Sequence, residues 1–325
     1  MKNGALLFAA VLAVWCGSTG GRAATTNLFS TGFEAAEGYS TDQDLAGQQN
    51  WQSEGSGGNG IIPGALQEQS AYIGFSPPEP ADASLVLWQP INFAPLTAGR
   101  PLVKFRVLVN ISDSSNGEYD IFRWSVYNHQ VNRLFSIDLD NLYLDVSYRL
   151  DGTNATVFTS IPFVNNSNYL LTVTMDFAAN RWSATWNDAI IATNQPLTTT
   201  NAPLTLGDID AIWLFNRTAI TNSQGQIEYV NAPGDNYMLF DNYQITAEAL
   251  PPPQAQLQLL GRTAAGWGLL RVLGRTGDRW AVEATTDFTA WSPLKTNIIS
   301  DGSFDAVDTH SGSLDRRFYR ARFVP

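Results

Sequence analysis

The sequence predicts an all-β protein in which a large antiparallel sandwich is followed by a small second sandwich. Short segments with alternating apolar and polar residues recur along the chain, and turn formers separate them. No segment repeats its apolar residues with the 3.6-residue period of a helix. Net charge changes at a run of three prolines, which indicates two parts. Many short strands at this spacing are typical of sandwiches and barrels.

The chain begins with the features of a secretory signal peptide, which we expect over residues 1–24. Lys2 precedes an apolar run of about 12 residues, and small residues follow the run. We expect cleavage near Ala23 or Ala24, and hence a protein that is secreted or held at the cell surface. No membrane span is predicted, because a span needs about 20 apolar residues.

The only cysteine, Cys16, lies inside this leader. Lipidation at Cys16 is the alternative to cleavage at the alanines, but lipidation sites favour a small residue before the cysteine, and Trp15 stands there. With cleavage at the alanines the mature chain has no disulfide and no cysteine-ligated metal.

Charge and proline content divide the mature chain into two domains and a linker. Residues 25–250 contain 8 Lys and Arg against 23 Asp and Glu, whereas residues 251–325 contain 9 against 7. Three prolines at the boundary cannot pair in a sheet and favour an extended spacer. We therefore expect a large acidic domain over 25–249, a proline-rich linker over 250–255 and a small domain over 256–325.

The large domain shows the period-2 pattern of half-buried strands in several segments. Within 102–109, four apolar residues fall on one parity while Lys104 and Arg106 fall on the other. The same alternation places three tryptophans among apolar neighbours. We predict that these three lie in the core: Trp124, Trp182 and Trp186.

The order of elements resembles that of a known superfamily. The matching parts are an opening segment with Phe33 and Glu34, a long glycine- and glutamine-rich loop with Trp51, a hairpin over 175–188 and a closing strand over 237–246. Over about residues 27–247 these parts look like the concanavalin A-like jelly-roll superfamily, in its laminin G-like and MAM-like branch. The resemblance implies a two-sheet jelly roll that most often serves glycan binding or adhesion, with a minority of glycoside hydrolases and polysaccharide lyases.

Asp241 shares the parity of the apolar residues of the closing strand, so we expect it to point inward. A buried carboxylate must be paired or must bind a cation. The resemblance implies that Glu34 and Asp241 share a structural Ca²⁺, with Asn242 or nearby carbonyls as helpers, and such oxygen ligands suit Ca²⁺. The alternative is that Asp241 accepts hydrogen bonds from backbone groups or an arginine.

An enzyme on this fold is the next hypothesis. The resemblance implies that retaining glycoside hydrolases carry a Glu-x-Asp-x-Glu strand motif, whose spacing puts the carboxylates on one face. Glu118 and Asp120 have this spacing, but Phe122 stands where the second glutamate belongs, or Arg123 if the motif is one residue longer. The catalytic pair is therefore incomplete.

The resemblance implies that lyases on this fold combine an arginine, a tyrosine and a histidine or glutamine, and the strand motifs that carry these residues are absent from this sequence. Tyr127 and His129 lie two residues apart, on one face of a strand, so a role in proton transfer is conceivable. A hydrogen-bonded residue at the surface is the alternative for His129. If the protein is an enzyme, we expect its site around Glu118, Asp120, Tyr127 and His129.

Exposed aromatic rings are the other feature that would indicate glycan binding. Trp51 lies in a polar loop without alternating apolar partners, and we expect Trp51 and Tyr72 to be exposed ligand-binding residues. An anchoring role for the Trp51 loop is the alternative.

The last 70 residues resemble a short C-terminal module that recurs on secreted bacterial proteins. The matching features are a strand with Glu283, a turn with Asp287 and Trp291, and a closing strand with arginines and aromatics over 316–323. The resemblance implies a small fibronectin- or immunoglobulin-like sandwich without a catalytic role. We expect no nucleic-acid partner, because a pI near 4.6 is far from the basic character of nucleic-acid-binding domains.

Together these features predict a secreted, non-catalytic binding or adhesion protein that recognises an extracellular polysaccharide or a cell-surface glycan. A polysaccharide-degrading enzyme and a structural surface protein without a specific ligand are the alternatives. Apart from the structural Ca²⁺, no cofactor is expected.

Overall fold

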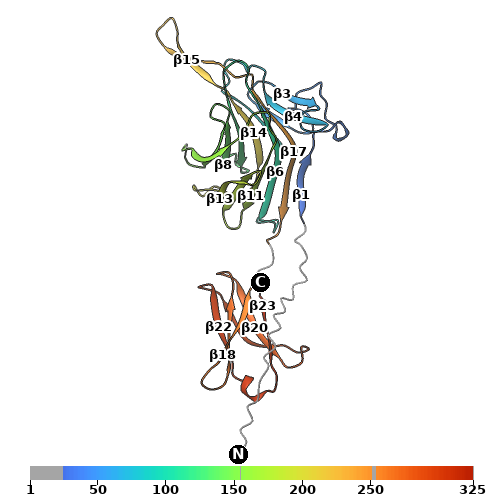
Figure 1. The fold of residues 1–325 in the computed structure, drawn as a ribbon, viewed down its shortest axis with the longest axis vertical. Coiled ribbons are helices and arrows are strands. Elements are labelled where there is room, and N and C mark those ends of the chain that lie inside the picture. The colour runs from blue at the N-terminus through green and yellow to red at the C-terminus, as the bar shows by residue number, and fades with distance from the viewer. Residues whose placement is uncertain (1–24, 154, 251–253, 325) are drawn as a thin grey trace, which may run out of the picture. The chain divides into compact units, whose positions relative to one another are not determined.

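The computed structural model describes residues 25–153, 155–250 and 254–324, and the chain divides between residues 250 and 251 into two compact units (Figure 1). The described residues form antiparallel strands and the short 3-10 helices η1 (Ala35–Glu37) and η2 (Ser311–Ser313), which confirms the all-β fold. The predicted signal peptide with Cys16, and the three linker prolines, lie outside the described residues. Within the described ranges, no helix is long and apolar enough to cross a membrane.

Eight strands among residues 25–250 form one layer of the large unit, which we call sheet A. The order is β13-β12-β11-β6-β17-β4-β3, and β1 also pairs with β17. The strands are β1 (Thr26–Thr31), β3 (Asn59–Pro63), β4 (Gln69–Gly74), β6 (Leu102–Ser112), β11 (Tyr169–Asp176), β12 (Arg181–Trp186), β13 (Ala189–Pro196) and β17 (Tyr237–Glu248).

Seven strands from the same residues form the second layer, which we call sheet B. The order is β10-β9-β8-β7-β14-β5-β2. The strands are β2 (Gln52–Glu54), β5 (Ser84–Trp88), β7 (Ile121–Tyr127), β8 (Arg133–Asp140), β9 (Asp145–Leu150), β10 (Val157–Pro162) and β14 (Asp208–Leu214). A separate hairpin of β15 (Arg217–Thr221) and β16 (Ile227–Asn231) projects from this unit (Figure 1).

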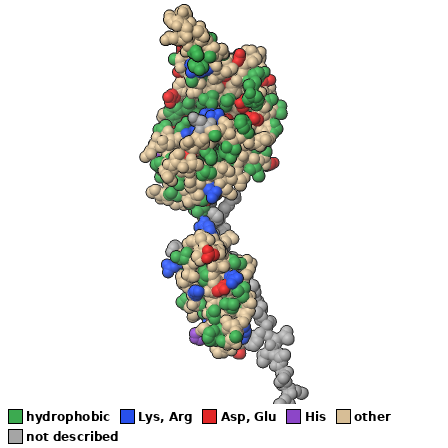
Figure 2. Space-filling model, turned by 90° about the vertical axis from the view of Figure 1, so that its left-hand side faces the viewer, with side chains coloured by type: hydrophobic (Ala, Val, Ile, Leu, Met, Phe, Trp, Pro, Cys, Tyr) green, Lys and Arg blue, Asp and Glu red, His purple; other side chains and the backbone are tan. Residues whose placement is uncertain are grey.

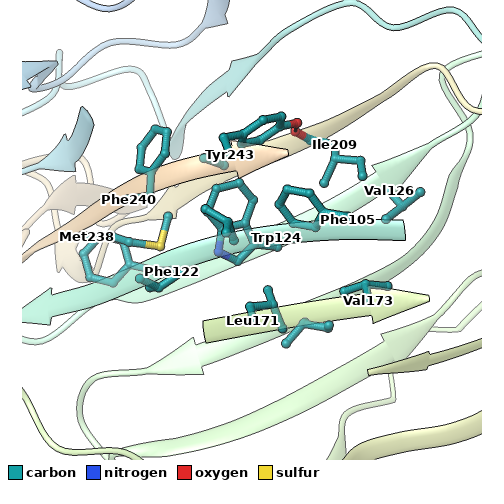
Figure 3. Packing of buried hydrophobic residues seen from close by; sticks show 14 of the residues in the cluster. Phe105, Phe122, Trp124, Val126, Leu171, Val173, Ile209, Met238, Phe240 and Tyr243 are labelled. Atoms are coloured by element: carbon teal, nitrogen blue, oxygen red, sulfur yellow. Dashed lines mark hydrogen bonds between the residues drawn. The ribbon is translucent and has the colours of Figure 1, made fainter. Parts of the chain in front are cut away.

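Large apolar side chains fill the space between sheets A and B. Trp124 of sheet B packs with its ring centroid 5.3 Å from Phe105 and 5.5 Å from Phe240 of sheet A (Figure 3). Tyr243 is buried in the same cluster, and its hydroxyl donates to the carbonyl of Ile209 at 2.9 Å, which satisfies the polar end of the ring. The predicted core positions of Trp124, Trp182 and Trp186 are confirmed.

The small unit is a sandwich of two three-stranded sheets within residues 254–324, as the sequence predicts. One sheet has the order β18-β19-β22 and the other β21-β20-β23. Its core includes Val272, Trp280 and Phe304. The strands are β18 (Gln256–Arg262), β19 (Gly268–Leu273), β20 (Arg279–Thr285), β21 (Ser292–Ile298), β22 (Ser303–Asp308) and β23 (Phe318–Phe323).

The arginine-rich end of the chain is the last strand of this small sandwich. β23 pairs with β20, and buried Glu283 of β20 accepts from Arg320 at 2.7 Å and from Arg322 at 2.9 Å. Arg317 pairs with buried Asp308 at 2.7 Å. These arginines therefore neutralise carboxylates of their own unit.

Candidate functional site

Polar side chains cover the side of sheet B that faces away from the core. Along β7, apolar Phe122, Trp124 and Val126 are buried in the core, so the residues between them point to the other side. Strand pairing aligns these residues with polar positions of β8, β9 and β14. We call this surface the polar face of sheet B; its members are Arg123, Ser125, Tyr127, Arg133, Ser136, Asp138, Asp140, Asp145, Ser147, Arg149, Asp208 and Asp210.

Asp138 is the centre of an ion-pair group on this face. Arg123 donates to it twice, from Nε to Oδ1 at 2.6 Å and from Nη2 to Oδ2 at 2.8 Å, and Nε of Arg149 lies 3.1 Å from Oδ2. The Asp138 side chain is 3% exposed and that of Arg123 11%. Such two-bond, charge-assisted contacts are strong and fix the orientation of both partners.

Arg133 completes a group of three arginines but has a different environment. Its Nη2 donates to the carbonyls of Leu150 and Thr153 at 3.3 Å each, and its buried Nε has no partner among the described residues. Burial and then the nearby charge of Arg123 lower the pKa of Arg133. The surroundings of Arg133 therefore make its positive charge less favourable than it would be in water.

Asp208 and Asp210 stand two residues apart on β14, opposite Tyr127 and Ser125 of β7. Burial, followed by the neighbouring Asp208 carboxylate, raises the pKa of Asp210 to about 9. Burial also raises the pKa of Asp208, and its hydrogen bond with Asp210 opposes this rise. The pair therefore keeps one proton at neutral pH, which Asp210 carries and donates to Asp208.

Glu118 and Asp120 lie at the opposite end of β7 from Tyr127 and His129, so the structure does not bring the four predicted catalytic residues together. Asp120 is buried and accepts three hydrogen bonds, from Trp213 Nε1 at 2.9 Å and from two backbone N–H groups, those of Asn216 at 2.6 Å and Gly234 at 2.9 Å. Its contacts anchor the chain on both sides of the β15–β16 hairpin. Glu118 Oε2 accepts from the Asn216 side chain at 2.7 Å.

Tyr127 and His129 lie at the end of β7 that belongs to the polar face. Burial and then the proximity of Asp210 raise the pKa of Tyr127. His129 is exposed, and its backbone N–H donates to Thr205 Oγ1 at 3.2 Å, three residues before Asp208. These two residues therefore neighbour the Asp208 and Asp210 pair rather than Glu118 and Asp120.

Trp51 is buried, so its predicted exposure is wrong. The residue is 1% exposed, and its Nε1 donates to the Tyr39 hydroxyl at 3.1 Å. Its ring lies 5.3 Å from that of Tyr243 and 5.7 Å from that of Phe33. The loop between η1 and β2 inserts Trp51 and Leu45 into the core, and the polar residues next to Trp51 in the sequence do not reveal this burial.

Tyr72 is half-buried on the side of sheet A that faces away from the core. Its ring lies edge-on to Tyr237 at 6.3 Å, and Tyr237 in turn contacts Phe75, which is 58% exposed. Tyr72 therefore belongs to a small aromatic group on a different sheet from the polar face.

Asp241 is 0% exposed, but its predicted orientation toward the core is wrong. A bulge between Asp241 and Gln244 changes the parity of β17, so Phe240 and Tyr243 both face the core, whereas Asp241 pairs with Leu108 on the outer side of sheet A. Its Oδ1 accepts the backbone N–H of Asn242 at 2.5 Å, whereas its Oδ2 has no partner among the described residues. Burial raises the pKa of Asp241 to about 6, and the charge of Glu34 adds to this rise. A Cβ placed on Gly32 would lie 3.8 Å from both Asp241 Oδ1 and Glu34 Oε1, so the two carboxylates border the same small space.

Glu34 and Asp241 supply some of the ligands that a hard cation such as Ca²⁺ needs, but not all of them. Glu34 and Asp241 offer oxygen ligands, and the buried, unpartnered Oδ2 lacks the positive group that it needs. Asn242 is exposed, and the contact that the structure shows from it to Asp241 is a backbone N–H, which cannot bind a cation. Among the described residues, no group of three or more His, Cys, Asp or Glu could hold a metal ion. Further ligands would have to be carbonyls or water.

Asn242 instead borders a cavity of about 500 Å³ on the side of sheet A that faces away from the core. Exposed Arg106 of β6 lies in the same lining. The other lining residues are Ser30, Thr31, Gly32, Glu37, Leu108, Leu170, Tyr243 and Gln244.

Sequence reasoning missed most of the polar face. Arg123, Asp138 and Asp210 each alternate with buried apolar residues, and this alternation could have identified them as one-sided polar positions. It could not show that β14 pairs with β7, because 80 residues lie between the two strands.

No family model matches the chain, and no curated protein matches its sequence. Among solved structures, the chain is similar to a protein of unknown function with a galectin-like fold from Bacillus subtilis, with 11% identity and a TM-score of 0.43 over 69% of this chain and 100% of that chain. It is also similar to a carbohydrate binding module from Bacillus subtilis, with 9% identity and a TM-score of 0.35 over 62% of this chain and 99% of that chain. A sialidase shares 7% identity and a TM-score of 0.42 over 60% of this chain, and the match spans 17% of the sialidase.

Proposed function

We propose that the protein is a secreted, non-catalytic carbohydrate-binding protein that holds an extracellular polysaccharide or a cell-surface glycan on the polar face of sheet B. The observation that supports this proposal is the concentration of hydrogen-bonding side chains on one side of four neighbouring strands. Arginines supply donors, aspartates supply acceptors, and Tyr127 supplies a hydroxyl group beside an aromatic ring. Strands hold such groups more rigidly than loops do, which favours recognition of a polymer rich in hydroxyl groups.

The unsatisfied polar atoms of this face support the same proposal. Ser125 Oγ, Ser136 Oγ and Asp210 Oδ1 are buried and have no hydrogen-bond partner among the described residues. Buried polar atoms without partners are rare in proteins, and water or a ligand accounts for many of them.

Retention on immobilised polysaccharides tests the proposal. The purified protein is passed over a panel of insoluble and bead-linked polysaccharides, beside a variant with Arg149→Gln and a variant with Arg106→Gln, whose changed residue lies on the outer side of sheet A. We expect retention on one or a few polymers, weakened by Arg149→Gln and unchanged by Arg106→Gln. Retention on no polymer would favour a structural surface protein without a glycan ligand.

A polysaccharide-degrading activity at the same face is the second proposal, because Tyr127 and His129 lie beside the Asp208 and Asp210 pair. Tyrosine, histidine and a protonated carboxyl are groups that transfer protons in catalysis. An assay for new reducing ends and for unsaturated sugar products on each retained polymer separates an enzyme from a binder. Product formation that Tyr127→Phe abolishes would replace the non-catalytic proposal.

We also propose that a structural Ca²⁺ binds between Glu34 and Asp241. A bound cation would supply positive charge to the buried Asp241 carboxylate and would link η1, which follows Glu34, to β17. The buried and unpartnered Oδ2 of Asp241 supports this site.

A further inference from the structure

Three arginines from three neighbouring strands of sheet B converge on the polar face: Arg123 on β7, Arg133 on β8 and Arg149 on β9. The charges of Arg123 and Arg149 both lower the pKa of Arg133, so the three guanidinium groups lie within electrostatic range of one another. Residues 25–250 contain only 8 Lys and Arg against 23 Asp and Glu. This acidic unit therefore places three of its few cations together. Figure 2 looks at the side of the unit where β8 lies and shows basic side chains gathered near the middle of that side.

The carboxylates of the face lie away from Arg133 or bond the other two arginines. Asp138 bonds Arg123 and Arg149. Asp140 and Asp145 pair at the other end of β8 and β9 from Arg133, and Asp208 and Asp210 lie on β14, beyond β7. Within residues 25–153, 155–250 and 254–324, no ion pair is found for Arg133, whose Nη2 donates only to backbone carbonyls. One guanidinium is therefore left without an anionic partner.

We infer, on the basis of the proposed function, that the polysaccharide bound on this face is acidic and that one of its carboxylate groups binds Arg133 and Arg149. A planar guanidinium matches a carboxylate through two parallel hydrogen bonds. The contact between Arg123 and Asp138 shows this geometry inside the face itself. A neutral polymer would remove water from Arg133 without supplying an anion, which is unfavourable for a partly buried charge.

The hydroxyl groups nearby suit the rest of a sugar ring. Tyr127 pairs with Arg133 across β7 and β8, and Ser136 pairs with Arg149 across β8 and β9. Each arginine thus has a hydroxyl-bearing neighbour on the adjacent strand. This arrangement lets one sugar unit place its carboxylate on the guanidinium groups and its hydroxyl groups on the tyrosine and the serine.

Binding to soluble polymers of known charge tests the inference. Affinity electrophoresis of the purified protein compares polygalacturonate and alginate, which carry carboxylates, with dextran sulfate, which carries sulfate esters, and with neutral dextran. We expect the carboxylate polymers to bind about tenfold or more tightly than dextran, and binding to weaken with added salt. Arg133→Gln and Arg149→Gln should each weaken this binding about tenfold.

Two further variants make the result specific. Arg106→Gln makes the same charge change on the outer side of sheet A and should leave the affinity unchanged. Arg133→Lys keeps the charge but removes the two-bond fork, so it should weaken carboxylate binding even where the variant's thermal unfolding matches that of the wild type. Equal losses from Arg106→Gln and Arg133→Gln would overturn the assignment to this face.

The polymer panel separates failure of this inference from failure of the proposed function. Retention on neutral polysaccharides alone would overturn the acidic ligand and leave glycan binding in place. Equal affinity for dextran sulfate and the carboxylate polymers would overturn the choice of a carboxylate. Binding to no polysaccharide of either kind would overturn the proposed function as well.

Discussion

Arg123 and Asp138 form an ion pair with two hydrogen bonds, of 2.6 and 2.8 Å, on the side of sheet B that faces away from the core. Arg149 is a second partner of the same carboxylate. Buried ion pairs of this kind add little stability compared with apolar packing, but removing one partner leaves an unpaired buried charge. The pair therefore makes the polar face sensitive to mutation and keeps its side chains in fixed positions.

Replacing Asp138 with alanine should lower the free energy of unfolding by about 3–5 kcal/mol, because two arginines lose their common anionic partner. Urea unfolding of the variant and the wild type measures this change. Asp188→Ala, in the exposed turn after β12, is the control and should change the value by less than about 0.5 kcal/mol. A loss below about 1 kcal/mol for Asp138→Ala would show that the Asp138 carboxylate of the wild type is exposed to water in the folded protein.

Asp210→Asn should stabilise the protein at alkaline pH. The pKa of Asp210 is about 9 in the folded protein and near its ordinary value in the unfolded chain, so folding takes up a proton between these values. Stability therefore falls as pH rises from about 4 to about 9. Asparagine resembles the protonated acid and does not titrate, so the variant should lose this part of the pH dependence.

Thermal unfolding of both proteins across this pH range measures the difference. Asp188→Asn is the matched control, because Asp188 is exposed, and it should keep the pH dependence of the wild type. An Asp210→Asn variant whose melting temperature follows the wild type at every pH would show that Asp210 is ionised in the folded protein.

The sequence predicts the two-sandwich fold because the period-2 pattern of each strand is local. The same pattern wrongly predicts that Asp241 points into the core, because it cannot show the bulge between Asp241 and Gln244 that changes the parity of β17. The site is harder to predict, because it depends on strands that are distant in sequence: the polar face requires β14 to lie beside β7. Glu118 and Tyr127 share one strand region but lie at its two ends, and spacing alone does not show which end faces a ligand.

The burial of Trp51 could not be predicted from the local sequence pattern either, because its neighbours in the sequence are polar. Trp51→Ala should lower the free energy of unfolding by about 3–5 kcal/mol, because it leaves a cavity among Phe33, Phe240 and Tyr243. Trp51→Phe should lower it less, since a ring still fills part of the space. Urea unfolding measures both variants. If Trp51→Ala is as stable as the wild type and loses glycan retention, the ring belongs to a ligand site.

Calcium should stabilise the wild type, and Asp241 should mediate this effect. Without a cation, the pKa of Asp241 is about 6, above its unfolded value, so stability falls as pH rises from about 4 to about 6 and stays low above that range. A bound Ca²⁺ favours the ionised carboxylate and should remove this loss. The expected result is a higher melting temperature in calcium than in chelator at neutral pH.

Two variants separate the cation from the buried charge. Asp241→Asn removes the charge, so it should be more stable than the wild type in chelator at neutral pH and should not respond to calcium. Glu34→Gln should also lose the calcium response but keep the fall in stability with rising pH, because Asp241 remains. Glu54→Gln, at an exposed position of β2, is the control and should respond to calcium like the wild type. Equal melting temperatures of the wild type in calcium and in chelator would exclude a cation between Glu34 and Asp241.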